Sequence, residues 1–175
     1  MSGLPGSGTS TAARKLAEAA GMRVLSAGEV FRDMAEERDM SLEDFSVLAE
    51  ENEEIDRKLD KRIVEEASPG MIMEGRLTGH LLHMSDKGAF KVWIKAPLET
   101  RVRRIAEREG HEDLDQLKER VIKRENSEEK RYREYYDIDL FDTSFYDAVI
   151  DSEKNRPDQI VDKIIDGVTD EVRDR

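Results

Sequence analysis

The sequence predicts an α/β protein, because short apolar segments alternate with longer amphipathic ones, and this alternation is typical of a parallel sheet with helices on both faces. Strand-like runs occur at residues 23–26, 71–73, 91–94 and 148–150. Between them, apolar residues recur every three or four positions, as in helices with one buried face. The length of 175 residues suits one domain with a substantial core, so we expect a single domain over residues 1–175.

Start and stop signals place the helices. The alanine-rich segment 9–20 ends at Gly21, a C-terminal cap. Ser41, with Asp44 three residues later, is a capping box that begins another helix. Pro157 opens the closing helix. The buried faces that we expect are Ile55, Leu59 and Ile63; Leu98, Val102, Ile105 and Ala106; Leu114, Leu117 and Val121; and Ile160, Ile164 and Val168.

The composition excludes several classes of protein. Acidic residues outnumber basic ones by 41 to 29, a net charge of −12, whereas proteins that bind duplex nucleic acid concentrate positive charge. No run approaches the roughly 18 apolar residues of a membrane span, and no signal peptide follows Met1. The chain has no cysteine, which fits a reducing compartment. We therefore expect a cytoplasmic protein, monomeric, without nucleic-acid or membrane partners.

A phosphate-binding loop is the most informative motif. Residues 3–10 have the spacing of the Walker A pattern G-x-x-x-x-G-K-[ST], in which backbone N–H groups surround phosphate oxygens and a hydroxyl, here that of Ser10, holds Mg²⁺. Thr9 stands where the pattern has lysine, so the positive charge that reaches the β- and γ-phosphates is missing. The residues expected to bind the nucleotide are Gly3, Leu4, Pro5, Gly6, Ser7, Gly8, Thr9, Ser10 and Thr11.

The segment before this loop is unusual. A phosphate loop normally follows a strand in the middle of the sheet, yet only Met1 and Ser2 precede Gly3. We therefore expect the first, central strand to be missing from this chain, either because its start is assigned too late or because the sheet lacks that strand and is poorly stable. A Gly/Ser/Thr run also suits a flexible linker, but a capped helix and a βαβ pattern follow directly and favour the loop.

Taken together, the motifs resemble the archaeal type of cytidylate kinase. The resemblance covers nearly the whole chain from Gly3, and its most specific stretches are residues 26–32, 40–45, 54–57, 60–62, 74–79, 95–97, 104–110 and 131–136. It implies the three-layer fold of P-loop nucleoside monophosphate kinases, with a helical excursion for the monophosphate at about 28–67 and a helical lid at about 110–140. The family transfers the γ-phosphate of ATP to CMP or dCMP with Mg²⁺.

Two arginines are expected at the acceptor. Arg32 and Arg76 each follow a predicted strand, and ligands of parallel sheets bind at the carboxyl ends of the strands. The resemblance makes both of them ligands of the monophosphate, with Ser26 and Gly28 beside it; the alternative is two surface arginines in ion pairs. Glu74 ends a strand, and two roles stay open for it: a place near the Mg²⁺ shell, or orientation of Arg76.

A second cluster lies in the proposed lid. Arg120, Arg124, Glu128 and Arg131 are spaced by four, four and three residues, so on a helix they share a face. The resemblance implies that lid arginines close over the transferring phosphoryl group, which makes Arg124 and Arg131, together with Arg76, the candidate catalytic residues. Glu128 would contact the acceptor's sugar or hold Arg131. The competing interpretation is an ordinary solvated helix face.

The roles of five further residues stay open. Arg101, Arg104 and Arg108 also share a helix face, where they either bind the adenine side of ATP or merely cover the surface. Asp56 and Asp60 fall one helical turn apart, and they either recognise the acceptor's base or are exposed acids.

The sequence leaves rival functions open. One is a kinase of another monophosphate, such as UMP or AMP, because a few base contacts decide this choice. Another is a nucleotide-binding protein without catalysis, which the missing lysine favours and the aligned lid arginines oppose. A third, an interaction module with a chance phosphate loop, leaves the ordered series of motifs unexplained.

Overall fold

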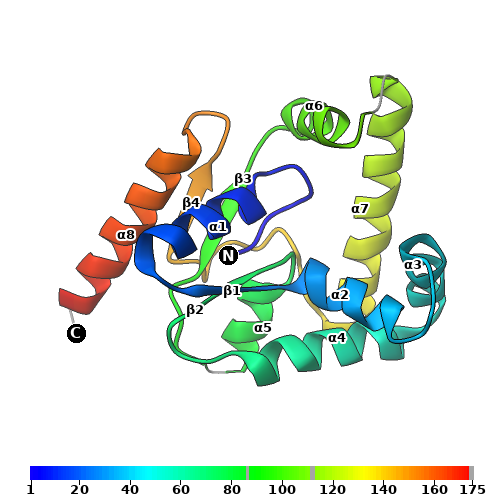
Figure 1. The fold of residues 1–175 in the computed structure, drawn as a ribbon, viewed down its shortest axis with the longest axis horizontal. Helices are drawn as coiled ribbons and strands as arrows, with labels where there is room; N and C mark the ends of the chain where they lie inside the picture. Colours follow the sequence, from blue (N-terminus) through cyan, green and yellow to red (C-terminus); the bar gives the residue numbers. More distant parts are fainter. Residues whose placement is uncertain (86, 111–112, 174–175) are drawn as a thin grey trace.

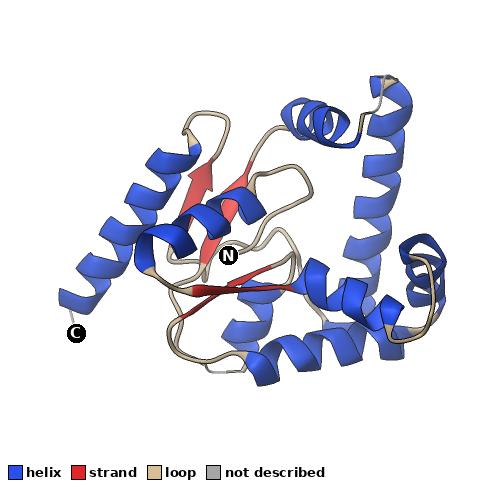
Figure 2. Cartoon of the chain, in the orientation of Figure 1, coloured by secondary structure: helices blue, strands red, loops and turns tan. Residues whose placement is uncertain are grey.

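The computed structural model describes residues 1–85, 87–110 and 113–173 of the chain. Its strands form two parallel pairs (Figures 1 and 2). Strand β1 (Arg23–Ser26) pairs with β2 (Met71–Glu74), and β3 (Val92–Lys95) pairs with β4 (Ala148–Asp151). The predicted parallel arrangement is confirmed, and all four strands fall within two residues of their expected places.

Met1 and Ser2 join the two pairs of strands. The Ser2 amide donates to the Val92 carbonyl at 2.8 Å, and the Ile94 amide donates to the Ser2 carbonyl at 2.8 Å. On the other side the Gly75 amide donates to the Met1 carbonyl at 3.2 Å, so Ser2 forms parallel bridges to Gly75, just after β2, and to Trp93 within β3. The central position that the sequence left empty is thus occupied, over two residues, and the phosphate loop starts in the middle of the sheet.

Both faces of the sheet are buried. On one face α1 (Thr9–Ala20) and α8 (Pro157–Arg173) pack over Ile72, Val92 and Ile94. On the other face α5 (Thr78–Met84) belongs to the core that contains the alternate residues Met73 and Trp93. Because successive side chains of a strand point to opposite faces, this alternation establishes a three-layer fold.

Two helical excursions leave the carboxyl ends of the strands. The first follows β1 and contains α2 (Ala27–Glu36), α3 (Leu42–Glu51) and α4 (Glu53–Glu66). The Ser41 hydroxyl caps α3 by accepting from the Asp44 amide at 3.1 Å, as the capping box predicted. The second follows β3 and contains α6 (Leu98–Glu109) and α7 (Leu114–Tyr136). In Figure 1, α7 stands apart from the sheet, opposite α8, with the phosphate loop between them.

Two residues expected in the core are exposed. Leu114 is 48% exposed because it begins α7 ahead of the cluster in which Leu117 and Val121 pack on α6. Val168 is 38% exposed because the end of α8 extends past the sheet (Figure 1).

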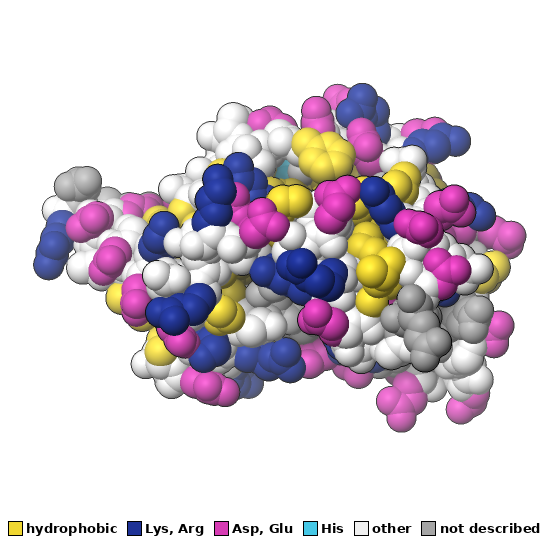
Figure 3. All heavy atoms as spheres, turned by 90° about the horizontal axis from the view of Figure 1, so that it is seen from above, with side chains coloured by type: hydrophobic (Ala, Val, Ile, Leu, Met, Phe, Trp, Pro, Cys, Tyr) yellow, Lys and Arg dark blue, Asp and Glu magenta, His cyan; other side chains and the backbone are white. Residues whose placement is uncertain are grey.

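The hydrated surface that the composition predicts is visible in Figure 3. Lys and Arg side chains are interspersed there with Asp and Glu, and hydrophobic side chains form only small patches. Across the described ranges, every helix is too short or too polar to traverse a bilayer.

Candidate active site

A cavity of about 870 Å³ opens at the carboxyl ends of the strands, between the phosphate loop and the two helical excursions. It gathers the residues that the sequence singled out for binding and catalysis, with Ser7 as the exception. Those that line it are Gly3, Leu4, Pro5, Gly6, Gly8, Thr9, Ser10, Thr11, Ser26, Gly28, Arg32, Arg76, Arg124, Glu128 and Arg131. Segments far apart in the sequence therefore form one site.

Two residues of the phosphate loop have backbone conformations that favour glycine. Gly6 and Gly8 have φ angles of 78° and 92°, in the left-handed region. A Cβ atom on Gly6 would also lie 2.6 Å from the Arg101 carbonyl oxygen, and one on Gly3 would lie 2.5 Å from the Ile94 carbonyl oxygen. The loop leads directly into α1, whose first N–H groups are free to bind an anion.

Thr9, in the lysine position, directs its hydroxyl to another residue of the loop. Its side chain is buried, and its hydroxyl lies 2.8 Å from that of Ser7. Ser7 does not line the cavity because its side chain faces inward, where it supports the loop, and its amide donates to the Leu4 carbonyl at 3.0 Å. The loop thus has no positive charge of its own, as its sequence predicts.

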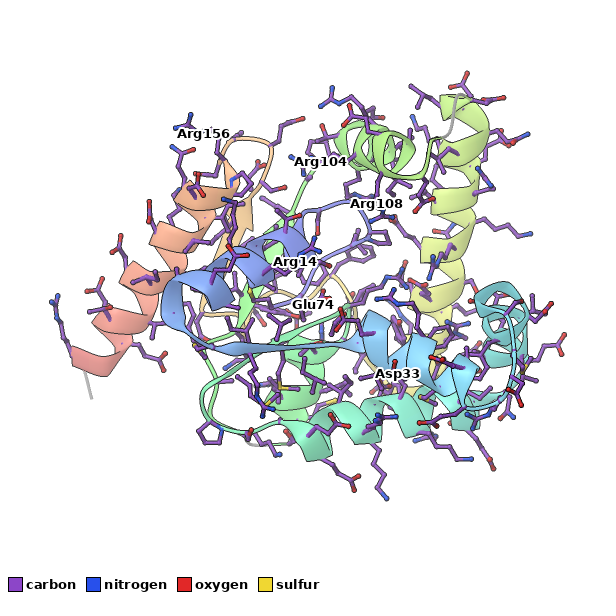
Figure 4. The ribbon with its side chains drawn as sticks, viewed as in Figure 1. Arg14, Asp33, Glu74, Arg104, Arg108 and Arg156 are labelled. Atoms are coloured by element: carbon purple, nitrogen blue, oxygen red, sulfur yellow. The ribbon has the colours of Figure 1, made fainter. Side chains whose placement is uncertain are left out.

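Glu74 lies at the end of β2 beside the loop (Figure 4). The Ser10 hydroxyl donates to its Oε2 at 3.1 Å, and the Ser26 hydroxyl donates to its Oε1 at 2.5 Å. This geometry favours the first of the two roles left open, because Glu74 contacts the predicted Mg²⁺ ligand Ser10, while the ion-pair partner of Arg76 is Glu128.

The oxygen atoms of Ser10 and Glu74 suit Mg²⁺, which binds one or two protein oxygens and completes its shell with water and substrate phosphates. Among the described residues, no cluster of three or more His, Cys, Asp or Glu side chains is arranged to hold a metal ion. A metal ion at Ser10 and Glu74 would therefore depend on phosphate oxygens for its remaining ligands.

Glu128 is shared by two arginines. Its side chain is 5% exposed, and one carboxylate oxygen pairs with the guanidinium group of Arg76 and, at 3.0 Å, with Nε of Arg124. Arg76 follows β2 whereas Arg124 and Glu128 are both on α7, so the carboxylate ties the second excursion to the end of β2. The expectation that Glu128 holds Arg131 is not met, because Arg131 has another partner.

That partner is Asp56 on α4, whose Oδ2 lies 3.3 Å from Nε of Arg131. Burial raises the pKa of Asp56 despite the neighbouring arginine. One turn further along, burial raises the pKa of Asp60 to about 7, with a contribution from the charge of Asp56, and the Tyr136 hydroxyl donates to Asp60 at 2.6 Å. The two acids are therefore part of the cavity wall and not exposed residues of an ordinary helix.

Two other predicted arginines differ in position. Arg32 is exposed on α2, with a guanidinium nitrogen 3.9 Å from the place where a Cβ of Gly28 would be, and it lines the cavity. Arg120 is exposed and does not line the cavity. The shared helix face predicted for Arg120, Arg124, Glu128 and Arg131 thus reaches the cavity only from Arg124 onward.

The arginines of α6 were left undecided by the sequence, and the structure separates them (Figure 4). Arg101 is buried, pairs with Glu125 and donates to the Pro5 carbonyl at 3.3 Å, so it supports the loop from behind. Arg104 donates to the Gly6 carbonyl at 3.3 Å and to the Ser152 hydroxyl at 2.9 Å, and it lines the cavity with Arg108.

Sequence reasoning missed Arg14 on α1 and Ser152 after β4, which also line the cavity. The Ser152 hydroxyl donates to the Ser7 carbonyl at 2.6 Å. The position of Arg14, four residues after Ser10, was a usable signal, since residues at this spacing share a helix face.

Comparison with known proteins agrees with this geometry. The sequence model of the cytidylate kinase-like family matches residues 1–154. The cytidylate kinase of Methanopyrus kandleri is 47% identical over 167 residues, covering 91% of this chain and 86% of the relative. Two solved structures share the fold. An uncharacterized protein from Eubacterium ventriosum matches with a TM-score of 0.69 and 22% identity, over 94% of this chain and 93% of the other. A gluconokinase from Sinorhizobium meliloti matches with a TM-score of 0.61 and 15% identity, over 99% of this chain and 91% of the other. The chain belongs to the cytidylate kinase-like family.

Proposed function

We propose that the protein is a cytidylate kinase, which transfers the γ-phosphoryl group of ATP to CMP or dCMP and releases ADP and CDP or dCDP. The observation that carries the proposal is the single cavity in which a phosphate loop faces Arg76, Arg124 and Arg131. A cavity of this composition suits two phosphorylated ligands placed end to end. The name of the 47% identical relative, cytidylate kinase, supports the choice of acceptor.

ATP binds with its phosphates against the loop. Backbone N–H groups of the loop and of the start of α1 contact the phosphate oxygens, since a helix N-terminus favours negative charge. Ser10 and Glu74 are the residues that would hold Mg²⁺, with its remaining ligands from phosphate and water. An ion held there would offset the negative charge that develops on the phosphates during transfer.

The acceptor binds on the opposite wall. Arg32 and Arg76 grip the monophosphate, because a guanidinium group donates two parallel hydrogen bonds to phosphate oxygens. Ser26 and Gly28 lie beside it, and the helices at about 28–67 enclose the nucleoside. Asp56 and Asp60, in the wall near Arg131, are available to the base or sugar.

Transfer needs positioning and charge more than covalent chemistry. An oxygen of the acceptor phosphate bonds to the γ-phosphorus while the bond from that phosphorus to the β–γ bridging oxygen breaks, and the electron pair leaves with ADP. Arg124 and Arg131 on α7 stabilise the transferring group. We assign residues of about 110–140 to a lid whose closure brings these arginines in and excludes water.

An assay of ADP release with Mg²⁺–ATP and each of CMP, dCMP, UMP, AMP and GMP tests the proposal. We expect turnover with CMP or dCMP at least tenfold above the other acceptors. A preference for UMP or AMP would replace the acceptor but keep the reaction. Nucleotide binding without turnover, which the uncharged Thr9 would favour, would indicate a non-catalytic nucleotide-binding protein. We also propose a monomer, which size-exclusion chromatography with light scattering checks.

A further inference from the structure

The phosphate loop lacks its usual cation, and the side chain in that position does not replace it. Thr9 is buried with its hydroxyl on Ser7. Transfer from a triphosphate without a cation near the β- and γ-phosphates leaves the developing charge poorly stabilised. Another residue of the cavity wall must therefore supply it, and the candidates are the seven arginines that line the cavity: Arg14, Arg32, Arg76, Arg104, Arg108, Arg124 and Arg131.

Most of these arginines are engaged by other parts of the protein. Carboxylates hold four of them: Arg76 and Arg124 on Glu128, Arg131 on Asp56, and Arg108 on Glu109. Arg104 donates to the carbonyls of Gly6 and Ser7 and to the Ser152 hydroxyl. Within residues 1–85, 87–110 and 113–173, Arg14 and Arg32 alone among the seven have neither a hydrogen-bond nor an ion-pair partner.

These two arginines lie on different sides of the cavity. Arg32 is on α2 beside Gly28, at the acceptor wall. Arg14 is on α1, the helix that begins at the phosphate loop. It follows Ser10 by four residues, so both side chains are on one face of α1, and Ser10 faces Glu74.

The tilt of side chains along α1 also favours contact between Arg14 and the phosphates. The Cα–Cβ bonds of a helix tilt toward its N-terminus, which for α1 is the phosphate loop. Four residues of helix span only about 6 Å, which the long arginine side chain can bridge. In the view of Figure 4, Arg14 is between Glu74 and the labelled arginines of α6, Arg104 and Arg108, and these four residues line the same cavity.

We propose that Arg14 supplies the positive charge that Thr9 does not, by binding the β- and γ-phosphate oxygens of the donor. The inference rests on the proposed use of ATP. An unpaired guanidinium group binds phosphate without first leaving a protein carboxylate, and its planar fork contacts two oxygens at once. The loop would thus hold the phosphates with backbone N–H groups, while the cation comes from the following helix.

The test is calorimetric titration of Arg14→Ala with a non-hydrolysable ATP analogue, ADP and AMP in the presence of Mg²⁺. Loss of a charge-assisted hydrogen bond is expected to weaken binding of the ATP analogue by about 10- to 100-fold. AMP, without β- and γ-phosphates, should bind as it does to the unaltered protein. Arg14→Lys, which keeps the charge, should retain most of the affinity.

A second variant tests directly whether a lysine at position 9 can replace the charge of Arg14. Thr9→Lys in the Arg14→Ala background should restore binding of the ATP analogue at least tenfold, because lysine then occupies the usual position. Thr9→Lys in the unaltered protein should gain less, since Arg14 is already present. The matched control is Arg103→Ala: Arg103 is an exposed arginine of α6 that does not line the cavity.

Unchanged affinity of Arg14→Ala for the ATP analogue, in protein with the normal unfolding temperature, would overturn the inference. Loss of that affinity in Arg108→Ala with none in Arg14→Ala would assign the charge to α6 instead. The outcome is separable from the proposed function: selective loss of binding in Arg14→Ala supports Arg14 even if no acceptor is phosphorylated. Conversely, CMP turnover that Arg14→Ala leaves unchanged supports the kinase and refutes Arg14.

Discussion

The two walls of the cavity are built in different ways. The donor wall, made of the phosphate loop and α1, presents glycine backbone, hydroxyl groups and a free arginine. The acceptor wall, made of α2–α4, the end of β2 and α7, contains buried carboxylates paired with arginines: Glu128 with Arg76 and the more exposed Arg124, and Asp56 with Arg131. The donor wall therefore depends on backbone geometry and the acceptor wall on charge balance.

This difference has an energetic reason. Backbone N–H groups at a helix start cost little to leave open to water, so the donor wall is formed before the nucleotide binds. Arginines buried without a partner are unstable, and carboxylates hold them in place until an anion arrives. An acceptor phosphate must then compete with Glu128 for Arg76, so substitutions in the two walls should have different effects.

The largest expected effect comes from the backbone of the donor wall. Gly6→Ala adds a Cβ at a left-handed φ of 78°, 2.6 Å from the Arg101 carbonyl oxygen, so the loop must move. A displacement of about 1 Å is expected to lower activity at least 100-fold. Gly21→Ala is the control, because Gly21 has a φ of 64° but nothing within 4 Å of its Cβ position, and it should cost about 1–2 kcal/mol of stability with activity retained. Equal activity of the two variants would contradict the rigid donor wall.

A smaller effect is expected from the shared arginine of the acceptor wall. Arg76→Ala removes a phosphate ligand and should lower kcat/KM for CMP by about 10²- to 10³-fold, the usual loss for one stabilising donor. Binding of an ATP analogue should stay within about twofold, because Arg76 belongs to the other wall. Arg133→Ala, an exposed arginine of α7 paired with Glu129, is the control. If Arg76→Ala weakened the ATP analogue as much as CMP, the division into two walls would fail.

Within α7, buried and exposed arginines should affect stability differently. Arg131→Ala leaves Asp56 buried without its ion pair and should lower the free energy of unfolding by about 3 kcal/mol. Arg124 is 61% exposed, and Arg124→Ala leaves Glu128 with Arg76, so a change below about 0.5 kcal/mol is expected. Urea denaturation measures both. Activity should fall in each variant, and equal stabilities would mean that the Asp56 pair is not energetically buried.

The last effect concerns the pH dependence of stability and not activity. Burial raises the pKa of Asp60 from its ordinary 3.8 to about 7, so the folded protein retains a proton that the unfolded chain releases. Stability should therefore fall as pH rises from about 4 to 7 and then level off, because the folded state binds more protons in that window. Asp60→Asn keeps an acceptor for the Tyr136 hydroxyl and should remove this part of the slope. Thermal unfolding from pH 5 to 8 measures this slope. If stability depended on pH in the same way in Asp60→Asn and in the unaltered protein, the raised pKa of Asp60 would be refuted.

The local elements could be predicted well from the sequence. The glycine loop, the helix that it begins and the four strands were each indicated by neighbouring residues, because caps and periodicity are local. The contacts between side chains far apart in the sequence were harder to predict. The sequence left Asp56 and Asp60 open between base recognition and exposed acids, and the structure places both in the cavity wall. Of the two roles expected for Glu128, holding Arg131 is not met, because Glu128 pairs with Arg76 and Arg124. A helical spacing shows which side chains share a face, and not what that face contacts.

By itself the sequence determined the α/β fold, the phosphate loop with its uncharged Thr9, and the arginines available for phosphate. Only the tertiary structure decided which of them meet, how Met1 and Ser2 join the strands, and which two arginines of the cavity wall have no partner among the described residues. The physical reason is the length of chain between partners: Ser10 and Glu74 are 64 residues apart, and Arg76 and Glu128 are 52 apart. Contacts of that kind depend on how the strands and excursions pack, which local propensity does not determine.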